Sequence, residues 1–104
     1  MSQQSIIGKH KTKVYREGST TFVRYWYTDV VAFNDDAIVL DNGGYHTNTT
    51  KSRMNQASVQ FNLGFHVFQK DYRWYVKFRG ENVLFNRQKV KLFRHGSRVS
   101  EDYE

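Results

Sequence analysis

One helix-type segment interrupts a chain that is otherwise patterned as short β-strands. Between residues 50 and 61 the apolar side chains recur at helical spacing: Met54, Ala57 and Phe61. Polar residues occupy the other positions, as on the polar side of an amphipathic helix: Lys51, Arg53, Asn55, Gln56 and Gln60. Thr49 or Thr50 can cap the start of this segment, and Gly64 can end it in the left-handed conformation. The sequence therefore predicts a single helix of about three turns.

The segments on both sides of this helix are rich in β-branched and aromatic residues and alternate with a two-residue period. The expected strands cover residues 14–16, 21–27 with a bend or a continuation to 33, 37–40, 65–68, 72–79, 83–85 and 89–93. Strands grouped before and after one helix, without strand-helix alternation, indicate an α+β fold. We expect six to seven short strands in the order β-β-β-α-β-β-β, forming a curled antiparallel sheet or a half-open barrel with the helix at one end.

The length of 104 residues is sufficient for one domain with its own core. We expect a flexible lead-in over residues 1–10, a single α+β domain over 11–98 and an acidic tail over 99–104. Cysteine is absent, which excludes disulfides, thiolate zinc sites and cysteine nucleophiles. No apolar run approaches the ~20 residues of a membrane-spanning helix, and the first residues lack the apolar stretch of a secretory signal. These features predict a cytoplasmic protein that does not contact membranes.

Positive charge is concentrated late in the chain. Residues 70–98 hold nine of the sixteen Lys and Arg residues and only two acids, in a chain with a net charge of +6. The strand expected at 72–79 would point Tyr72, Trp74, Val76 and Phe78 toward the core and Arg73, Tyr75, Lys77 and Arg79 outward. Cations around a tyrosine attract phosphates and offer a ring for base stacking, although a solvated strand face has the same pattern. Lys89 and Lys91 would extend this basic surface if the last strand pairs beside that strand.

A second candidate site lies at the start of the predicted helix. Backbone N–H groups and the helix dipole favour anions there, yet the first turn carries the cations Lys51 and Arg53. Together with the hydroxyls of Thr49 and Thr50, these cations would form an anion cradle that a phosphate could occupy. The alternative is an ordinary capped helix end whose hydroxyls face solvent.

No catalytic or metal centre is apparent in the sequence. The four histidines are far apart and match no local metal motif: His10, His46, His66 and His95. The aspartates lie around predicted turns, where turn capping accounts for them. The nucleophile elbow and the P-loop pattern are missing as well. We therefore expect no enzymatic activity, no bound metal and no cofactor.

The segment around the predicted helix is the most distinctive part of the chain. It combines Thr49-Thr50-Lys51, a basic residue, the run Met54-Asn55-Gln56-Ala57-Ser58 and a glycine before an aromatic strand. Together with residues 40–48, 61–65 and 69–70, this combination resembles small uncharacterised proteins encoded by bacteriophages. The resemblance covers about a third of the chain. It implies a phage or metagenomic viral origin and an intracellular role during infection, and it implies no catalytic residue.

These observations together predict a non-enzymatic accessory protein that binds nucleic acid, DNA or RNA, with little sequence preference. The expected contact residues are Thr49, Thr50, Lys51, Arg53, Arg73, Tyr75, Lys77, Arg79, Lys89 and Lys91. Two alternatives use the same basic surface or an exposed strand edge. One is a modulator that binds an acidic host or phage protein, and the other is a structural or assembly component of a virion.

Overall fold

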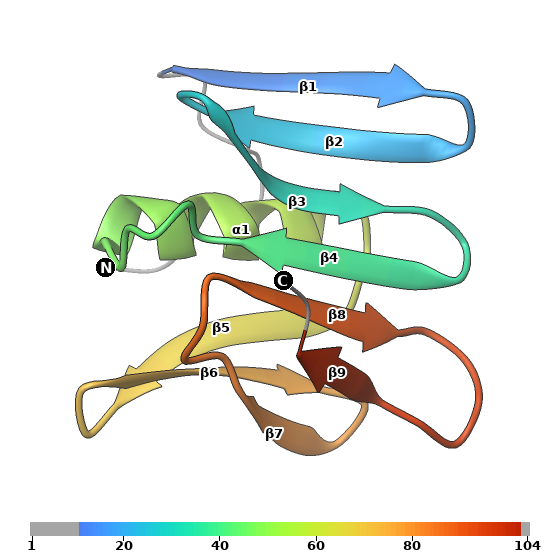
Figure 1. Cartoon of the computed structure of the whole chain (residues 1–104). Coiled ribbons are helices and arrows are strands. Elements are labelled where there is room, and N and C mark those ends of the chain that lie inside the picture. The colour runs from blue at the N-terminus through green and yellow to red at the C-terminus, as the bar shows by residue number, and fades with distance from the viewer. Residues whose placement is uncertain (1–10, 103–104) are drawn as a thin grey trace.

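The computed structural model describes residues 11–102, and this part of the chain contains one helix and nine strands (Figure 1). Four strands precede the helix: β1 (Thr12–Glu17), β2 (Thr20–Tyr25), β3 (Thr28–Phe33) and β4 (Ala37–Asp41). The helix α1 covers Asn48–Gln60. Five strands follow it: β5 (Phe65–Lys70), β6 (Arg73–Phe78), β7 (Glu81–Leu84), β8 (Lys89–Phe93) and β9 (Ser100–Asp102). The lead-in expected over residues 1–10 lies outside the described residues.

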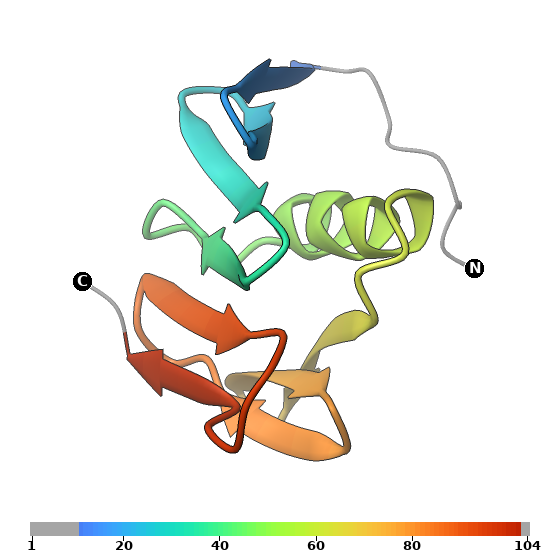
Figure 2. The ribbon, with the colours of Figure 1, turned by 90° about the vertical axis from the view of Figure 1, so that its right-hand side faces the viewer.

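The strands form two antiparallel sheets. Six of them make one sheet in the order β1-β2-β3-β4-β8-β9, and β5, β6 and β7 make a second sheet. Figure 2 shows the larger sheet curving from β1 past β4 to β9, with the smaller sheet below it and α1 to one side. The expected α+β class, with antiparallel strands and one helix, is confirmed. The two sheets do not close into a barrel.

The described chain has more strands than the six to seven expected from sequence. One reason is that β2 and β3 are separate strands, because the chain reverses at Trp26 and Tyr27. Trp26 adopts a positive φ of 58° in this turn. Glycine or asparagine usually occupies such a position, so the sequence carried no turn signal there.

The other additional strand is β9. Residues 100–102 were expected in an acidic tail, but they pair antiparallel with β8, and Glu101 lies opposite Lys91. The side chain of Arg98 also forms an ion pair with Glu101 at 3.2 Å. The ordered domain therefore extends beyond residue 98, and part of the acidic segment lies beside basic residues of β8.

A single cluster of buried hydrophobic side chains joins both sheets and the helix. Its members are Val23, Val30, Val31, Ile38, Leu40, Met54, Ala57, Leu63, Phe65, Val67, Trp74, Val76, Phe78, Phe85, Val90 and Leu92. Full burial of one large apolar side chain stabilises a fold by about 1.5–3 kcal/mol. Trp74 packs edge-on against Phe85, with 5.8 Å between ring centroids. The smaller sheet is thus anchored to the core through one of its faces.

The helix starts and ends close to the predicted positions, but its cap differs. The N-cap is Thr47, whose Oγ1 accepts a hydrogen bond from the backbone N–H of Thr50 at 3.2 Å. Thr49 and Thr50 were the expected caps, and Thr50 is instead buried within the first turn. Gly64, with a φ of 79°, lies just after the helix as expected. The N-cap was predicted two or three residues too late, because Thr47, Thr49 and Thr50 all have side chains that can cap a helix.

Candidate nucleic-acid interface

Strand β6 separates its side chains as the alternating pattern predicts. Trp74, Val76 and Phe78 are buried, whereas Arg73 and Lys77 are exposed and Tyr75 is half-buried. Tyr72 was expected on the core side, but it lies in the turn before β6 and is 95% exposed. The turn explains this difference, because the strand alternation begins only at Arg73.

The strands on both sides of β6 complete its outward face. The register places Phe68 of β5 and Leu84 of β7 opposite Tyr75, and it places His66 of β5 opposite Lys77. Directly opposed residues of antiparallel strands point to the same side. We call this surface the basic-aromatic face, and its members are His66, Phe68, Lys70, Arg73, Tyr75, Lys77 and Leu84.

The rings on the basic-aromatic face form a row. Phe68 and Tyr75 are stacked with 5.5 Å between centroids and 19° between planes. His66 and Phe68 are close to parallel, at 6.3 Å and 14°. Leu84, 46% exposed, stands opposite Tyr75. Unpaired bases stack on rows of this kind because every base has a flat π-face.

The cations of this face are open to solvent. Lys70, Arg73 and Lys77 are exposed, and none of them forms an ion pair with any residue between 11 and 102. The inward-pointing residues of β5 and β6 are in the core, so the three cations and the rings share one side of the sheet. The prediction that the side chains of Arg73, Tyr75 and Lys77 point to the same, outward side of β6 is confirmed.

Arg79 has a different role from its neighbours on β6. Its guanidinium donates hydrogen bonds to three backbone carbonyls, those of Phe93 at 3.0 Å, Gly96 at 2.6 Å and Arg98 at 3.4 Å. The planar, forked donor geometry of arginine suits such multiple contacts. Arg79 therefore ties the end of β6 to the loop between β8 and β9, and it is not part of the open basic-aromatic face.

Lys89 and Lys91 lie on another sheet. They would have extended the basic surface if β8 paired beside β6, but β8 pairs with β4 and β9. The ammonium group of Lys89 is 4.0 Å from a carboxylate oxygen of Asp41. Lys91 stands opposite Glu101. Acids accompany both lysines, so they do not join the cations of β5 and β6.

The residues at the helix start diverge instead of forming a cradle. Lys51 reaches toward β5, where its Nζ is 3.5 Å from Oε1 of Gln69. Arg53 reaches the other way, toward the larger sheet, and its Nε donates to Oγ1 of Thr12 at 2.9 Å. Thr50 is 3% exposed, and its hydroxyl is bonded to that of Thr47. The predicted anion cradle is therefore not assembled at this helix end.

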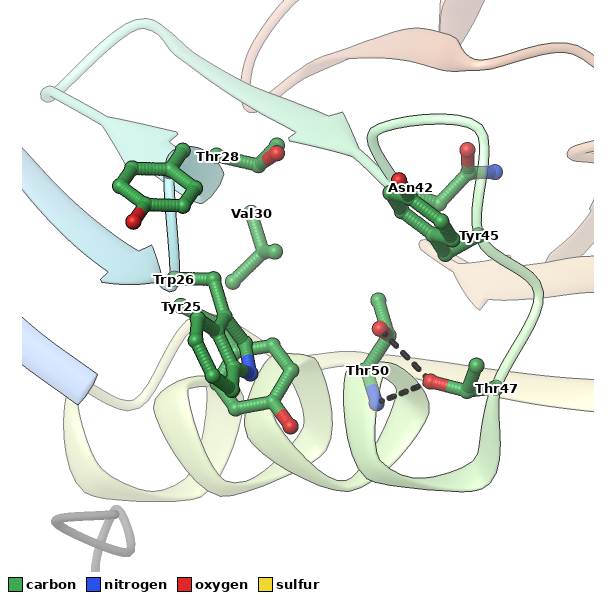
Figure 3. Close-up of a pocket in the computed structure, with 9 residues that line it drawn as sticks. Tyr25, Trp26, Thr28, Val30, Asn42, Tyr45, Thr47 and Thr50 are labelled. Carbon is green, nitrogen blue, oxygen red and sulfur yellow. Dashed lines mark hydrogen bonds between the residues drawn. The ribbon is translucent and has the colours of Figure 1, made fainter. Parts of the chain in front are cut away.

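The structure contains a pocket that the sequence interpretation missed. It has a volume of about 470 Å³ and is lined by Tyr25, Trp26, Tyr27, Thr28, Val30, Asn42, Tyr45, Thr47 and Thr50 (Figure 3). A signal was available, because three consecutive aromatic residues, Tyr25 to Tyr27, cannot all point to one side of a strand. Trp26 is 50% exposed and Tyr27 is 92% exposed.

The outer face of the larger sheet holds a polar network. Tyr15, Arg24 and Asp29 are joined there, with the Tyr15 hydroxyl 2.8 Å and 2.9 Å from the two Asp29 carboxylate oxygens. Partial desolvation, and then this hydrogen bond to Asp29, raise the pKa of Tyr15 above its ordinary value. Arg24 donates to the same carboxylate, which raises the pKa of Arg24. The charges of Arg24 and Asp29 offset each other, so this face is not an open cationic surface.

Two kinds of site are absent from the described part of the chain. Between residues 11 and 102 no three side chains of His, Asp or Glu gather as a metal site would require. Within the same range no helix has the length and apolar character needed to cross a membrane.

The fold defines a small α+β protein with one helix and antiparallel sheets. The model of the Kyanoviridae Gp96 protein family matches residues 1–100, and the chain belongs to that family. The resemblance to bacteriophage-encoded proteins is thereby confirmed. No curated protein and no solved structure matches the chain. The family match assigns no activity to the chain.

Proposed function

We propose that the protein binds nucleic acid, with little sequence preference, through the basic-aromatic face. The role is non-enzymatic binding inside the infected cell. The stacked row of His66, Phe68 and Tyr75 beside Lys70, Arg73 and Lys77 is the observation that carries the proposal. Cations hold phosphates without reading sequence, and rings accept any base.

The exposed ring of His66 and the half-exposed rings of Phe68 and Tyr75 favour a single strand over a duplex. In a duplex the bases are stacked on each other and their faces are closed to a protein side chain. The face is also narrow, since β5, β6 and β7 form a surface only three strands wide. The expected ligand is therefore single-stranded DNA or RNA, bound across the strands.

Salt dependence gives a quantitative expectation. Each phosphate neutralised on a single strand contributes a slope of about −0.7 to the plot of log affinity against log salt concentration. Contacts by Lys70, Arg73 and Lys77 would give a slope of about −2. Replacing two of these cations by neutral residues would reduce the slope to about −0.7.

The experiment compares two double variants with the same change in charge. Arg73→Gln/Lys77→Gln removes cations from the basic-aromatic face, and Lys89→Gln/Lys91→Gln removes them from β8 on the other sheet. Binding of fluorescent single-stranded and double-stranded oligonucleotides is measured by anisotropy over a range of salt. The first variant should lose affinity and most of the slope, whereas the second should stay close to the parent protein.

Two results would contradict the proposal. Absence of oligonucleotide binding at low salt would remove nucleic acid as the ligand and would leave an acidic protein as the partner to seek. Equal losses in both double variants would show that only the net charge matters. Circular dichroism of each variant checks that the fold is retained.

A further inference from the structure

The pocket beside the start of α1 is walled by aromatic rings from two separate segments. Tyr25, Trp26 and Tyr27 come from the connection between β2 and β3, and Tyr45 comes from the loop between β4 and α1. Figure 3 shows Tyr25 and Trp26 on one side of the opening and Tyr45 on the other, with Val30 between them. Its volume of about 470 Å³ is in the range of small-molecule sites.

The lining of the pocket is uncharged, and the polar groups at its base are already bonded. The Asn42 amide accepts from the Gly44 N–H at 2.8 Å and donates to the Arg87 carbonyl at 3.2 Å. The hydroxyls of Thr47 and Thr50 are bonded to each other at 2.9 Å. A charged group inside the pocket would lose its hydration without gaining an opposite charge. The pocket therefore suits a flat, neutral ring held mainly through its faces.

Cations stand at the margin of the pocket and not within it. The Nζ of Lys11 is 5.2 Å from the centroid of the Trp26 ring. On the other side, Lys51 follows the pocket residue Thr50 and reaches Gln69 on β5. A ligand with a neutral ring and an anionic group could place the ring inside and the anion beside one of these lysines. A nucleotide has this distribution of charge.

The backbone supports the same interpretation. Trp26 holds a φ of 58° although it is a large residue without special freedom in the left-handed region. Asparagine or glycine would form this turn with less strain. Such a conformation keeps the indole at the mouth of the pocket, where it is 50% exposed.

We propose that this pocket takes up one unpaired nucleobase, stacked against Trp26 and Tyr45, from a strand whose phosphates contact the lysines at its margin. This inference rests on the proposed function, because the base belongs to the same strand that the basic-aromatic face binds. Lys51 follows the pocket residue Thr50 and reaches Gln69, which is next to Lys70 of the basic-aromatic face but lies on the core side of β5, opposite Trp74. A strand bound to both surfaces therefore passes around the end of the smaller sheet.

Trp26 itself can report on the pocket. The chain has two tryptophans, and Trp74 is 2% exposed whereas Trp26 is 50% exposed. The variant Trp74→Phe leaves Trp26 as the single tryptophan, whose emission can be excited apart from that of the tyrosines. The Trp74 indole nitrogen has no hydrogen-bond partner among the described residues, so the change leaves no partner group unpaired. If Trp74→Phe is unstable, the parent protein is compared with Trp26→Phe, because only an emission change that is lost in Trp26→Phe reports on the pocket.

The experiment titrates the full chain with three probes: a single-stranded oligonucleotide, an oligonucleotide of the same length composed of abasic sites, and a nucleoside monophosphate. The base-containing oligonucleotide and the monophosphate should quench Trp26 emission, and the abasic strand should bind without quenching. Tyr45→Ala should weaken binding of the base-containing strand by roughly 5- to 150-fold, as expected for a lost stacking partner. Tyr72→Ala is the matched control, because this exposed tyrosine lies outside the pocket.

The outcomes separate this inference from the proposed function. If the oligonucleotide binds but leaves Trp26 emission unchanged, and Tyr45→Ala binds as the parent does, the pocket is not a base site and the basic-aromatic face still stands. Equal quenching by abasic and base-containing strands would also overturn the inference. If neither the oligonucleotide nor the monophosphate binds, both proposals fall. If the monophosphate binds and quenches but no oligonucleotide binds, the pocket takes a free nucleotide, and both the proposal for the sheet face and the inference of a base from a bound strand are overturned.

Discussion

Asn55 of α1 is hydrogen-bonded through both ends of its side-chain amide to the backbone of Val67 in β5. Its Nδ2 donates to the Val67 carbonyl at 2.9 Å, and its Oδ1 accepts from the Val67 N–H at 2.7 Å. Ser58, one helical turn later, bonds the carbonyl and the N–H of Phe65 at 2.6 Å and 2.9 Å. Strand β5 is at the edge of the smaller sheet, so two helix side chains take the place of a neighbouring strand. These hydrogen bonds hold the smaller sheet, which carries the basic-aromatic face, against the helix.

Replacing Asn55 with alanine should destabilise the protein strongly. The change leaves a buried N–H and a buried carbonyl of Val67 without partners, and each unsatisfied group costs about 1–3 kcal/mol. We expect the free energy of unfolding in urea to fall by about 2–4 kcal/mol. Val59→Ala on the same helix, at a side chain that is 56% exposed, should change it by less than about 0.5 kcal/mol. A similar small loss for Asn55→Ala would mean that the edge of β5 is satisfied in another way.

The position of the helix was predictable from the sequence, but part of its polar side was wrongly expected to face solvent. The apolar period identified Met54 and Ala57 as core residues, and both are fully buried. Asn55 and Gln56 were assigned to the polar side, yet they are 3% and 6% exposed. Hydrophobic periodicity separates apolar from polar positions, and it cannot tell a polar residue in water from one that bonds a buried strand edge.

The candidate site was predictable where it depends on local alternation, and not where it depends on strand pairing. The two sides of β6 follow from a period of two within one segment. The position of Lys91 depends instead on whether β8 pairs with β6 or with β4, which is a contact between distant segments. The pocket depends on Trp26 in a left-handed turn and on Tyr45 from a later loop. The turn at Trp26 carries no glycine or asparagine signal. Gly43 and Gly44 predict the loop before Tyr45, but they do not show which distant residues Tyr45 meets.

Gly43 and Gly44 offer a matched test of the loop that carries Tyr45. Both have positive φ, 65° and 85°, so alanine is strained at either position. A Cβ on Gly43 would also stand 2.6 Å from Oγ1 of Thr28, whereas nothing lies within 4 Å of a Cβ on Gly44. We expect both variants to lose about 1 kcal/mol from backbone strain, with a larger loss for Gly43→Ala in thermal or urea unfolding.

The contact with Thr28 has a further consequence, because Thr28 lines the pocket. Gly43→Ala should therefore change the Trp26 emission spectrum of the free protein, and Gly44→Ala should leave it unchanged. Equal stability and equal spectra for the two variants would show that the Thr28 side chain moves aside without effect.

The Tyr15 hydroxyl should make stability depend on alkaline pH. Its pKa in the folded protein is raised from the ordinary value of 10.0, first by desolvation and then by its hydrogen bond to Asp29. The folded state therefore holds this proton more tightly than the unfolded state does. The stabilising contribution is complete below pH 10.0 and is lost as the pH rises through the folded-state pKa.

Urea unfolding at neutral pH and at several values above pH 10.0 measures this effect. The parent protein should lose stability more steeply in the alkaline range than Tyr15→Phe, which has no hydroxyl to ionise. Tyr27→Phe is the control for removing a hydroxyl elsewhere, because the Tyr27 side chain is 92% exposed. If Tyr15→Phe keeps the full alkaline slope of the parent, another group is responsible for it.

Variants of Arg79 and Lys77 should show that the first cation stabilises the fold and the second binds nucleic acid, although the two residues are close together at the end of β6. Arg79→Lys keeps the charge but loses the forked donor that reaches the carbonyls of Phe93, Gly96 and Arg98. We expect it to lower the free energy of unfolding by about 1–2 kcal/mol and to leave oligonucleotide affinity nearly unchanged. Lys77→Gln should do the reverse, with a stability change within about 0.5 kcal/mol and weaker binding, because Lys77 is exposed and unpaired within residues 11–102. Urea unfolding and anisotropy titration of both variants test this separation, and a loss of binding in Arg79→Lys at full stability would place Arg79 in the interface after all.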